Sequence, residues 1–275
     1  MLKNFKDNGY IILKNVLNDE QLCFINSTWD KLKEKPFKDH FPYIVGTHID
    51  NSPWEMPFSF TNFGSAPFGY YLHTNLQAII EHKLGLELIP TYFFSREYYT
   101  DSVLYAHRDR PSCEISATIA IGHETSSMQP WAIWVKNDKE FSVKRNAPFE
   151  VSQGLNELER NDENCQAIYL EPGDMMVYQG CNVIHWRDPF DGNFSRHTFI
   201  HFVNKNGLIY KQFPEIEYDF RDSLSGSYSD IKPEKAKLME KVNSLSGYPN
   251  WPEENACKNF LSIFCFSVSS LCFFK

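Results

Sequence analysis

The sequence predicts a mainly β protein with flanking helices and a core that is a sandwich or a jelly roll. Many short apolar segments separated by turn residues lie between about residues 90 and 203, and segments with helical periodicity lie mostly before and after them. Aromatic residues are abundant, with 23 Phe, 14 Tyr and 6 Trp. This composition suits a β-rich core around a lined cavity better than a helical bundle.

The segment before residue 90 is expected to hold one strand, two helices and irregular chain. Residues 9–13 form an apolar strand, and Asn18 can cap a helix that runs to about Lys35. Residues 36–68 are rich in Pro, Phe, Asn and Gly, which is typical of irregular structure. Residues 76–84 carry an apolar stripe at helical spacing and end at a glycine.

The core strands are expected at residues 90–99, 103–106, 115–121, 131–135, 140–143, 167–170, 175–178, 183–186 and 197–203. A further helix is expected within residues 233–245. The chain then divides into an N-terminal support segment of strand, helices and irregular chain (1–89), a core (90–212) and a C-terminal extension (213–275). At 275 residues, we expect these parts to form one compact domain.

Charge and cysteine usage narrow the class of protein. With 35 acidic and 27 basic residues, the chain lacks the basic surface of a nucleic-acid binder. The seven cysteines include no C-x-x-C pair and no secretory signal is visible, so we expect reduced thiols and a cytoplasmic location. The uncharged tail at residues 259–274 contains four serines and is shorter than the ~20 residues of a membrane span. A membrane association is therefore disfavoured, although a tail anchor stays open.

Three residues have the chemistry of an iron site. His107 and Asp109 offer an imidazole and a carboxylate at the end of one expected strand, and His185 lies on another. Two histidines and one carboxylate form the facial triad of non-heme Fe(II) sites, which leaves coordination positions open for chemistry. Strands of one jelly roll can bring these ligands together although 76 positions (185 minus 109) separate Asp109 from His185.

Arg196 and Thr198 lie two residues apart on an expected strand and therefore share one face. A guanidinium binds a carboxylate bidentately, and a neighbouring hydroxyl can donate one more hydrogen bond. Because the metal would already have a carboxylate ligand, we expect Arg196 to hold an anion from outside, namely a cosubstrate. A surface ion pair with a nearby aspartate is the alternative for Arg196. His197 and His201 share the opposite face and are interpreted as packing residues.

Two other patterns compete with the iron site. His48 and Asp50 repeat the ligand spacing, but they lie in a Pro- and Asn-rich loop without a strand before it and are interpreted as a surface turn. Residues 107–109 also match the start of a kinase catalytic loop, yet Glu114 stands where that loop needs Asn. The kinase interpretation therefore fails.

The residues of the site resemble those of the Fe(II)- and 2-oxoglutarate-dependent dioxygenases, in their prolyl 4-hydroxylase-like and phytanoyl-CoA hydroxylase-like branches. The resemblance spans about residues 2–205 and rests on the opening segment and the site motifs, namely residues 8–17, His107-x-Asp109, His185 and Arg196-x-Thr198. It implies a double-stranded β-helix core, which is a cupin-like jelly roll. It also implies that the triad binds Fe(II) and that Arg196 and Thr198 bind 2-oxoglutarate, with O2 as the other cosubstrate. Tyr98 and Thr118 would help to bind the same carboxylate.

The activity implied by this resemblance is the oxidative decarboxylation of 2-oxoglutarate to succinate and CO2, coupled to hydroxylation of an unactivated C–H bond. The substrate would be a protein side chain or a small molecule. Family members with a small residue in place of the metal carboxylate can halogenate, so the presence of Asp109 favours hydroxylation. Two alternatives stay open: a cupin-like metal-dependent oxygenase or isomerase that does not use 2-oxoglutarate, and a non-catalytic jelly-roll binding module.

Overall fold

Two antiparallel sheets form the core of the protein. The computed structural model describes residues 2–33, 44–45, 59–63, 67–109, 111–136, 165–212 and 214. The strands of the larger sheet are β1 (Tyr10–Leu13), β2 (Ile44–Val45), β3 (Ser59–Phe63), β4 (Leu88–Tyr98), β6 (Ile115–Thr125), β9 (Met175–Tyr178) and β11 (Gly192–Asn204). The strands of the smaller sheet are β5 (Leu104–His107), β7 (Ile133–Lys136), β8 (Cys165–Ile168) and β10 (Ile184–Arg187).

The order of these strands is that of a jelly roll. Among the described residues the larger sheet runs β1-β9-β6-β11-β4-β3-β2 and the smaller one runs β5-β10-β7-β8, with antiparallel pairing throughout. A cluster of apolar side chains fills part of the space between the two sheets, including Ala120 and Met176 from one sheet and Ile133 and Val135 from the other. The predicted fold class, mainly β with flanking helices and a double-stranded β-helix core, is confirmed.

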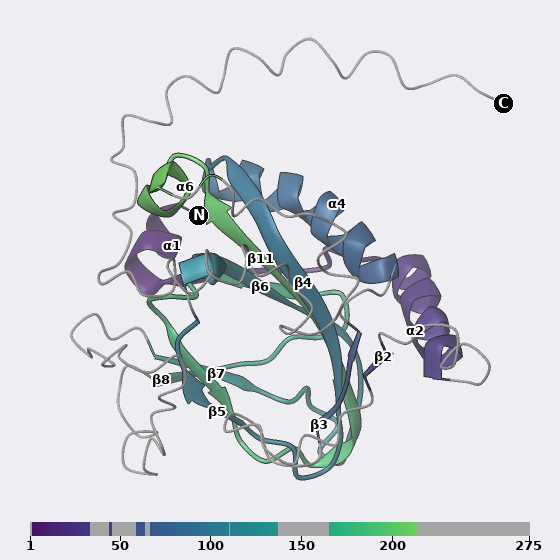
Figure 1. Ribbon diagram of the computed structural model, residues 1–275. Helices are drawn as coiled ribbons and strands as arrows, with labels where there is room; N and C mark the ends of the chain where they lie inside the picture. The colour runs from purple at the N-terminus through teal and green to yellow at the C-terminus, as the bar shows by residue number, and fades with distance from the viewer. Residues whose placement is uncertain are drawn as a thin grey trace, which may run out of the picture.

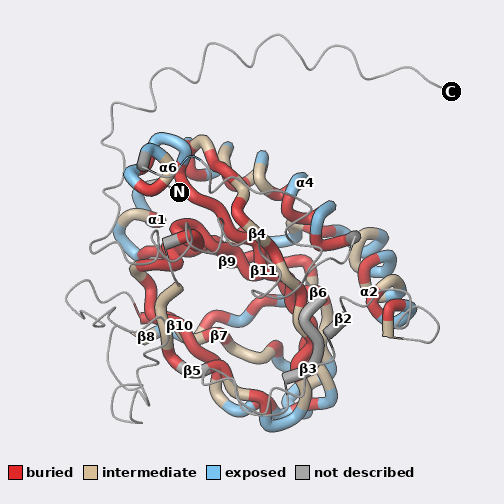
Figure 2. Tube along the Cα trace, viewed as in Figure 1, coloured by how far each residue is buried: buried red, intermediate tan, exposed pale blue. Residues whose placement is uncertain are grey.

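Helices cover the outer face of the larger sheet (Figure 1). They are α1 (Leu2–Asn8), α2 (Asp19–Lys33) and α4 (Pro67–Leu84), while the short α6 (Leu208–Gln212) follows β11. Side chains from these helices and from the outer face of the sheet form the main apolar core, which includes Trp29, Leu72 and Ile80 with Phe93 and Ile119. Figure 2 shows the consequence: β9 is buried throughout, and most of β6 and β11 is buried as well.

The predicted start of α2 is confirmed and has a local cause. The Asn18 side chain accepts a hydrogen bond from the backbone N–H of Gln21 at 2.9 Å, and the Gln21 side chain accepts one from the backbone N–H of Asn18 at 2.9 Å. This reciprocal pair is a capping box, which satisfies two N–H groups that the first turn of a helix leaves unpaired.

Several elements differ from the expectation. The segment 36–68, interpreted as irregular, contains β2, β3 and the start of α4, and α1 and α6 were not expected. These elements depend on tertiary packing: Phe5 of α1, for example, has no exposed surface. Packing of this kind overrides weak local propensity. The expected elements at residues 140–143 and 233–245, the tail at 259–274 and the pattern at 48–50 all lie outside the described residues. In the part of the chain that the structure describes, no helix combines the length and apolar character needed to span a bilayer.

Candidate metal centre

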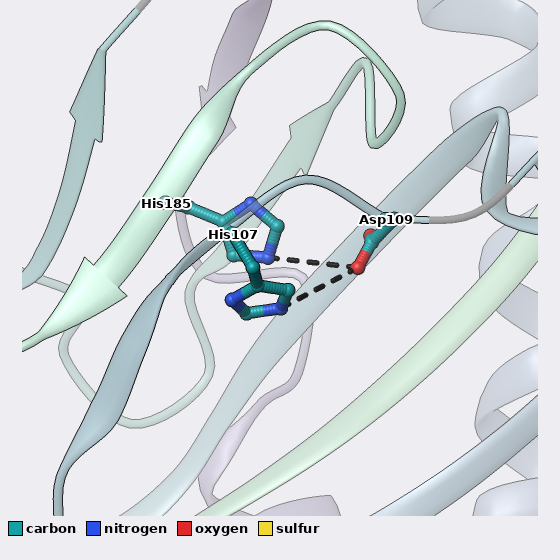
Figure 3. Close-up of side chains that lie close together, drawn as sticks. All are labelled: His107, Asp109 and His185. Atoms are coloured by element: carbon teal, nitrogen blue, oxygen red, sulfur yellow. Dashed lines mark ion pairs between the residues drawn. The ribbon is translucent and has the colours of Figure 1, made fainter. Parts of the chain in front are cut away.

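Two histidines and one aspartate converge between neighbouring strands of the smaller sheet. His107 is the last residue of β5 and is paired directly with His185 of β10. Asp109 follows β5, and its Oδ1 lies 3.7 Å from Nε2 of His107 and 3.6 Å from Nε2 of His185 (Figure 3). Paired residues on antiparallel strands have Cβ atoms roughly 4.5–5.5 Å apart, so the pairing itself brings the two imidazoles to one place. The structure thus brings together the three residues that the sequence suggests as metal ligands.

The donor atoms of this triad fit a single transition-metal ion. They lie within 4.8 Å of one another. Two atoms that each lie about 2.1 Å from one ion are at most about 4.2 Å apart, and both carboxylate-to-imidazole distances satisfy this limit. The side chains of His107 and Asp109 are 19% and 13% exposed, so the centre is accessible from solvent on that side. The donor set is that of non-heme Fe(II) sites.

His185 is held in its neutral form with Nε2 directed at the candidate centre. Its Nδ1 lies 3.1 Å from the carbonyl oxygen of Val183 and donates a hydrogen bond to it, which leaves the lone pair on Nε2. Burial and then the neighbouring His107 lower the pKa of His185 to about 4. The edge of the Tyr178 ring packs against the imidazole with ring centroids 4.9 Å apart, which restricts its rotation.

Asp109 is positioned by its backbone and by a serine. Its N–H donates to the carbonyl oxygen of Gly180 at 2.8 Å, and the Ser116 hydroxyl donates to its Oδ2 at 2.7 Å. Ser116 Oγ also lies 2.9 Å from Nδ1 of His201. Burial raises the pKa of Asp109, but the histidines, His185 foremost, and the Ser116 hydrogen bond outweigh it and keep that pKa below its usual value. Because Ser116 holds Oδ2, Oδ1 is left to face the two imidazoles.

Arg196 and Thr198 face away from this centre. The three guanidinium nitrogens of Arg196 donate to side chains of β4 and α2, namely Glu97 (2.7 Å), Asn26 (3.0 Å) and Asp30. Thr198 Oγ1 lies 2.8 Å from Oγ of Ser95, also under the helices. The expectation that this face of β11 meets a cosubstrate is therefore corrected: it packs against helices, and Arg196 forms ion pairs with the buried Glu97 and the exposed Asp30.

The opposite face of β11 lines the space between the sheets. His201 lies beside Ser116 at the metal centre, and the ring of His197 is 6.0 Å from that of Tyr98. Tyr98 is therefore on the inner side, where it packs edge-on against Trp131 at 5.1 Å. Thr118 is also on the inner side because it lies two residues after Ser116 on β6; its buried hydroxyl has no hydrogen-bond partner among the described residues. Of the four residues expected to bind the cosubstrate, the structure places only these two on the inner side of the larger sheet.

A second arginine, Arg187, lies on the inner side and was missed in the sequence. It ends β10 two residues after His185 and is 1% exposed. Its Nη1 donates to the carbonyl oxygen of Trp131 at 2.6 Å, whereas Nε and Nη2 have no partner in the part of the chain that is described. The sequence pattern that could have identified Arg187 is the two-residue repeat of a β-strand, which puts residues 185 and 187 on one face.

Comparison with known proteins supports the fold. No protein-family model and no curated protein matches the chain. Its structure is similar to HygX from Streptomyces hygroscopicus with nickel, 2-oxoglutarate and hygromycin B bound, with a TM-score of 0.51, 11% identity and coverage of 74% of this chain and 86% of HygX. It is also similar to EctD from S. alaskensis with 2-oxoglutarate and 5-hydroxyectoine, with a TM-score of 0.53, 15% identity and 74% coverage of both chains. A third similar structure is SnoN, a non-heme α-ketoglutarate-dependent epimerase from nogalamycin biosynthesis, with a TM-score of 0.51, 12% identity and coverage of 74% and 81%.

The fold and the site occur together in this chain. The chain shares the double-stranded β-helix fold of HygX, EctD and SnoN. Within this fold it carries two imidazoles and one carboxylate directed at a common point.

Proposed function

We propose that this protein is an Fe(II)- and 2-oxoglutarate-dependent oxygenase that hydroxylates a C–H bond of a small molecule. The observation that carries the proposal is the convergence of His107 Nε2, Asp109 Oδ1 and His185 Nε2. The use of 2-oxoglutarate is supported by the structures of HygX and EctD, which contain it. The small-molecule ligands of those two structures, hygromycin B and 5-hydroxyectoine, support a substrate of similar size.

The residues of the chain would prepare the reaction in three ways. Fe(II) held by the triad would supply the activation of O2, with 2-oxoglutarate as the electron donor and succinate and CO2 as its products. The hydrogen bond from His185 to Val183 keeps Nε2 free of a proton, and the Ser116 hydroxyl keeps Asp109 Oδ1 directed at the ion. His107, Asp109 and His185 would supply three ligands to the ion and would leave its other coordination positions to exogenous ligands.

The position of Arg196 favours a second candidate, a metal-dependent oxygenase or isomerase that does not use 2-oxoglutarate. The guanidinium already binds Glu97 and Asp30, so it is not available to an incoming carboxylate. The two candidates differ in one property. Only the first requires the metal-loaded protein to bind 2-oxoglutarate.

The test measures metal and cosubstrate binding together with succinate release. The parent protein is loaded anaerobically with Mn(II) for calorimetric titration with 2-oxoglutarate, and with Fe(II) for assays of succinate after O2 is admitted. We expect His107→Ala and Asp109→Ala to abolish both the binding of 2-oxoglutarate and the release of succinate, because each variant removes one of the three proposed metal ligands. His82→Ala, at an exposed position of α4, is the matched control and should behave as the parent. Succinate release by Asp109→Ala at the parent rate would refute the proposal, and a metal-loaded parent that does not bind 2-oxoglutarate would favour the second candidate.

A further inference from the structure

Arg187 is a buried cation without a counter-ion among the described residues. Its guanidinium makes one hydrogen bond, to the Trp131 carbonyl, and lies 4.9 Å from the centroid of the Trp131 ring. Nε and Nη2 have no hydrogen-bond partner within the described chain. An interior charge that is neither paired nor fully hydrogen-bonded is strongly unfavourable. An anionic ligand that binds the Arg187 guanidinium would compensate this charge.

Within the described part of the chain, the titratable groups that interact most with Arg187 are neutral or cationic. Its electrostatic neighbours include the phenols of Tyr98 and Tyr178 and the imidazole of His197. Burial lowers the pKa of Arg187 to about 10, so the guanidinium stays charged at neutral pH. His197 Nδ1 and Thr118 Oγ1, on the same inner side, also have no hydrogen-bond partner among the described residues. The inner side thus offers the buried charge of Arg187 and two further polar groups to a ligand.

The separation of Arg187 from His185 along β10 sets the length of a ligand that could reach both the metal and the guanidinium. Arg187 and His185 point to the same side of β10, and two residues of a strand span about 7 Å. A ligand that chelates the metal through a 2-oxo carboxylate and carries a second carboxylate two methylenes further on has a matching length. Arg196, the arginine that motif spacing suggests, cannot fill this role because the side chains of Glu97, Asn26 and Asp30 already accept from its nitrogens.

We propose that Arg187 is the anion-binding residue of this active site and that it binds the distal carboxylate of a five-carbon 2-oxo dicarboxylate. The proposal rests on the proposed function, since it takes the ligand to be 2-oxoglutarate bound at the metal. It moves the carboxylate site from β11 to β10, onto the strand that also supplies a metal ligand. Arg187 is then a specificity-determining residue, because a 2-oxo acid without the second carboxylate gains nothing from it.

The test compares two 2-oxo acids on the Mn(II)-loaded full-length protein without oxygen. The probes are 2-oxoglutarate and 2-oxobutyrate, which both chelate the metal, although only 2-oxoglutarate has a distal carboxylate. Calorimetry gives both affinities for the parent, Arg187→Met, Arg187→Lys and Arg196→Gln. We expect Arg187→Met to weaken 2-oxoglutarate binding by about 100-fold, the value of a charge-assisted bidentate pair, and to leave 2-oxobutyrate binding unchanged. Arg187→Lys should recover part of the preference, and Arg196→Gln should keep all of it.

A stability measurement separates a binding residue from a structural one. Arg187→Met replaces an unpaired buried charge by an apolar side chain of similar length, so the ligand-free variant should have a Tm equal to or above that of the parent. Addition of 2-oxoglutarate and Mn(II) should raise the Tm of the parent more than that of the variant.

The other possible outcomes contradict either the inference about Arg187 or the proposed function. If Arg187→Met keeps the parent preference for 2-oxoglutarate, or if Arg196→Gln loses it instead, the anion site is not at Arg187 while the proposed function stands. A ligand-free Arg187→Met with a strongly lowered Tm would make Arg187 a structural residue and refute the inference. A metal-loaded parent that binds neither 2-oxo acid would refute the proposed function and, with it, the site built on it.

Discussion

Ser116→Ala removes the hydrogen bond that orients the carboxylate ligand of the candidate metal centre. Ser116 is fully buried, and its hydroxyl donates to Asp109 Oδ2 at 2.7 Å. Since the serine has one proton to give, His201 Nδ1, at 2.9 Å, donates to the same oxygen in return. Without the hydroxyl, Asp109 can rotate and Oδ1 is no longer held toward the two histidines.

The expected loss of metal affinity follows from the energy of this bond. A hydrogen bond to a charged group contributes about 1.5–3 kcal/mol. Since 1.4 kcal/mol is tenfold in an equilibrium constant, the variant should bind metal about 10- to 100-fold more weakly. The same range is typical when a residue that orients a metal ligand is removed.

The assay is a calorimetric titration of the metal-free protein with Mn(II) at constant pH. Ser95→Ala is the matched control, because Ser95 is equally buried on the same sheet and its hydroxyl lies 2.8 Å from Thr198 Oγ1 on the opposite face. It should lose about 1 kcal/mol of unfolding free energy and keep the parent metal affinity. A folded Ser116→Ala variant with parent affinity would show that the carboxylate needs no such support.

Three further predictions test other parts of the structure. Gly180→Ala should weaken Mn(II) binding by about 10- to 100-fold in the same titration, because a Cβ there would lie 2.2 Å from the Cys113 carbonyl oxygen and 2.7 Å from the Asp109 carboxylate; unchanged binding would contradict the observed packing. Burial lowers the pKa of His73 to about 4, so between pH 6.5 and 4 the unfolded chain binds a proton that the folded one does not, and unfolding free energy should fall by about 1.4 kcal/mol per pH unit on acidification. When the pH falls from 7 to 5, the unfolding free energy measured with urea should decrease by about 2 kcal/mol less in His73→Phe than in the parent. An equal decrease in both proteins would exclude this histidine as the cause. Glu97→Gln should lower the unfolding free energy by about 3–5 kcal/mol, since it leaves the buried guanidinium of Arg196 without its inner partner, and should not change Mn(II) affinity.

The parts of the fold that local chemistry determines were predictable from the sequence. Residues 175–178 form a strand with the predicted bounds, and Asn18 caps α2 as expected. The elements that were missed, such as the first turns of α4, are stabilised by contacts with residues far away in the chain. Gly69 of α4 packs so closely on Phe93 that a Cβ there would lie 2.5 Å from its ring, and no local pattern announces such a contact.

The candidate metal ligands were predictable from the sequence, whereas the side of β11 that faces the candidate site was not. His107 and His185 converge because their strands are neighbours, and a histidine at the end of a strand is visible in the sequence. The orientation of β11 is not visible, because all ten residues from 195 to 204 are buried. Helices cover one face of this strand and the smaller sheet lies over the other, so alternation separates two sets of side chains without showing which set meets the cavity.

The two arginines show what distinguishes a residue that holds the fold from one that is available to a ligand. Arg196 lies at the distance from His185 that the family motif requires, yet Glu97 and Asp30 neutralise it, and these residues are 99 and 166 positions away in the chain. A guanidinium whose charge is already compensated attracts no further anion, whatever its spacing from a metal ligand. Arg187 lacks such compensation among the described residues, although it is more deeply buried. A buried cation is unfavourable without an anion. A carboxylate ligand would therefore gain more binding free energy at Arg187 than at Arg196, although Arg196 has the expected spacing.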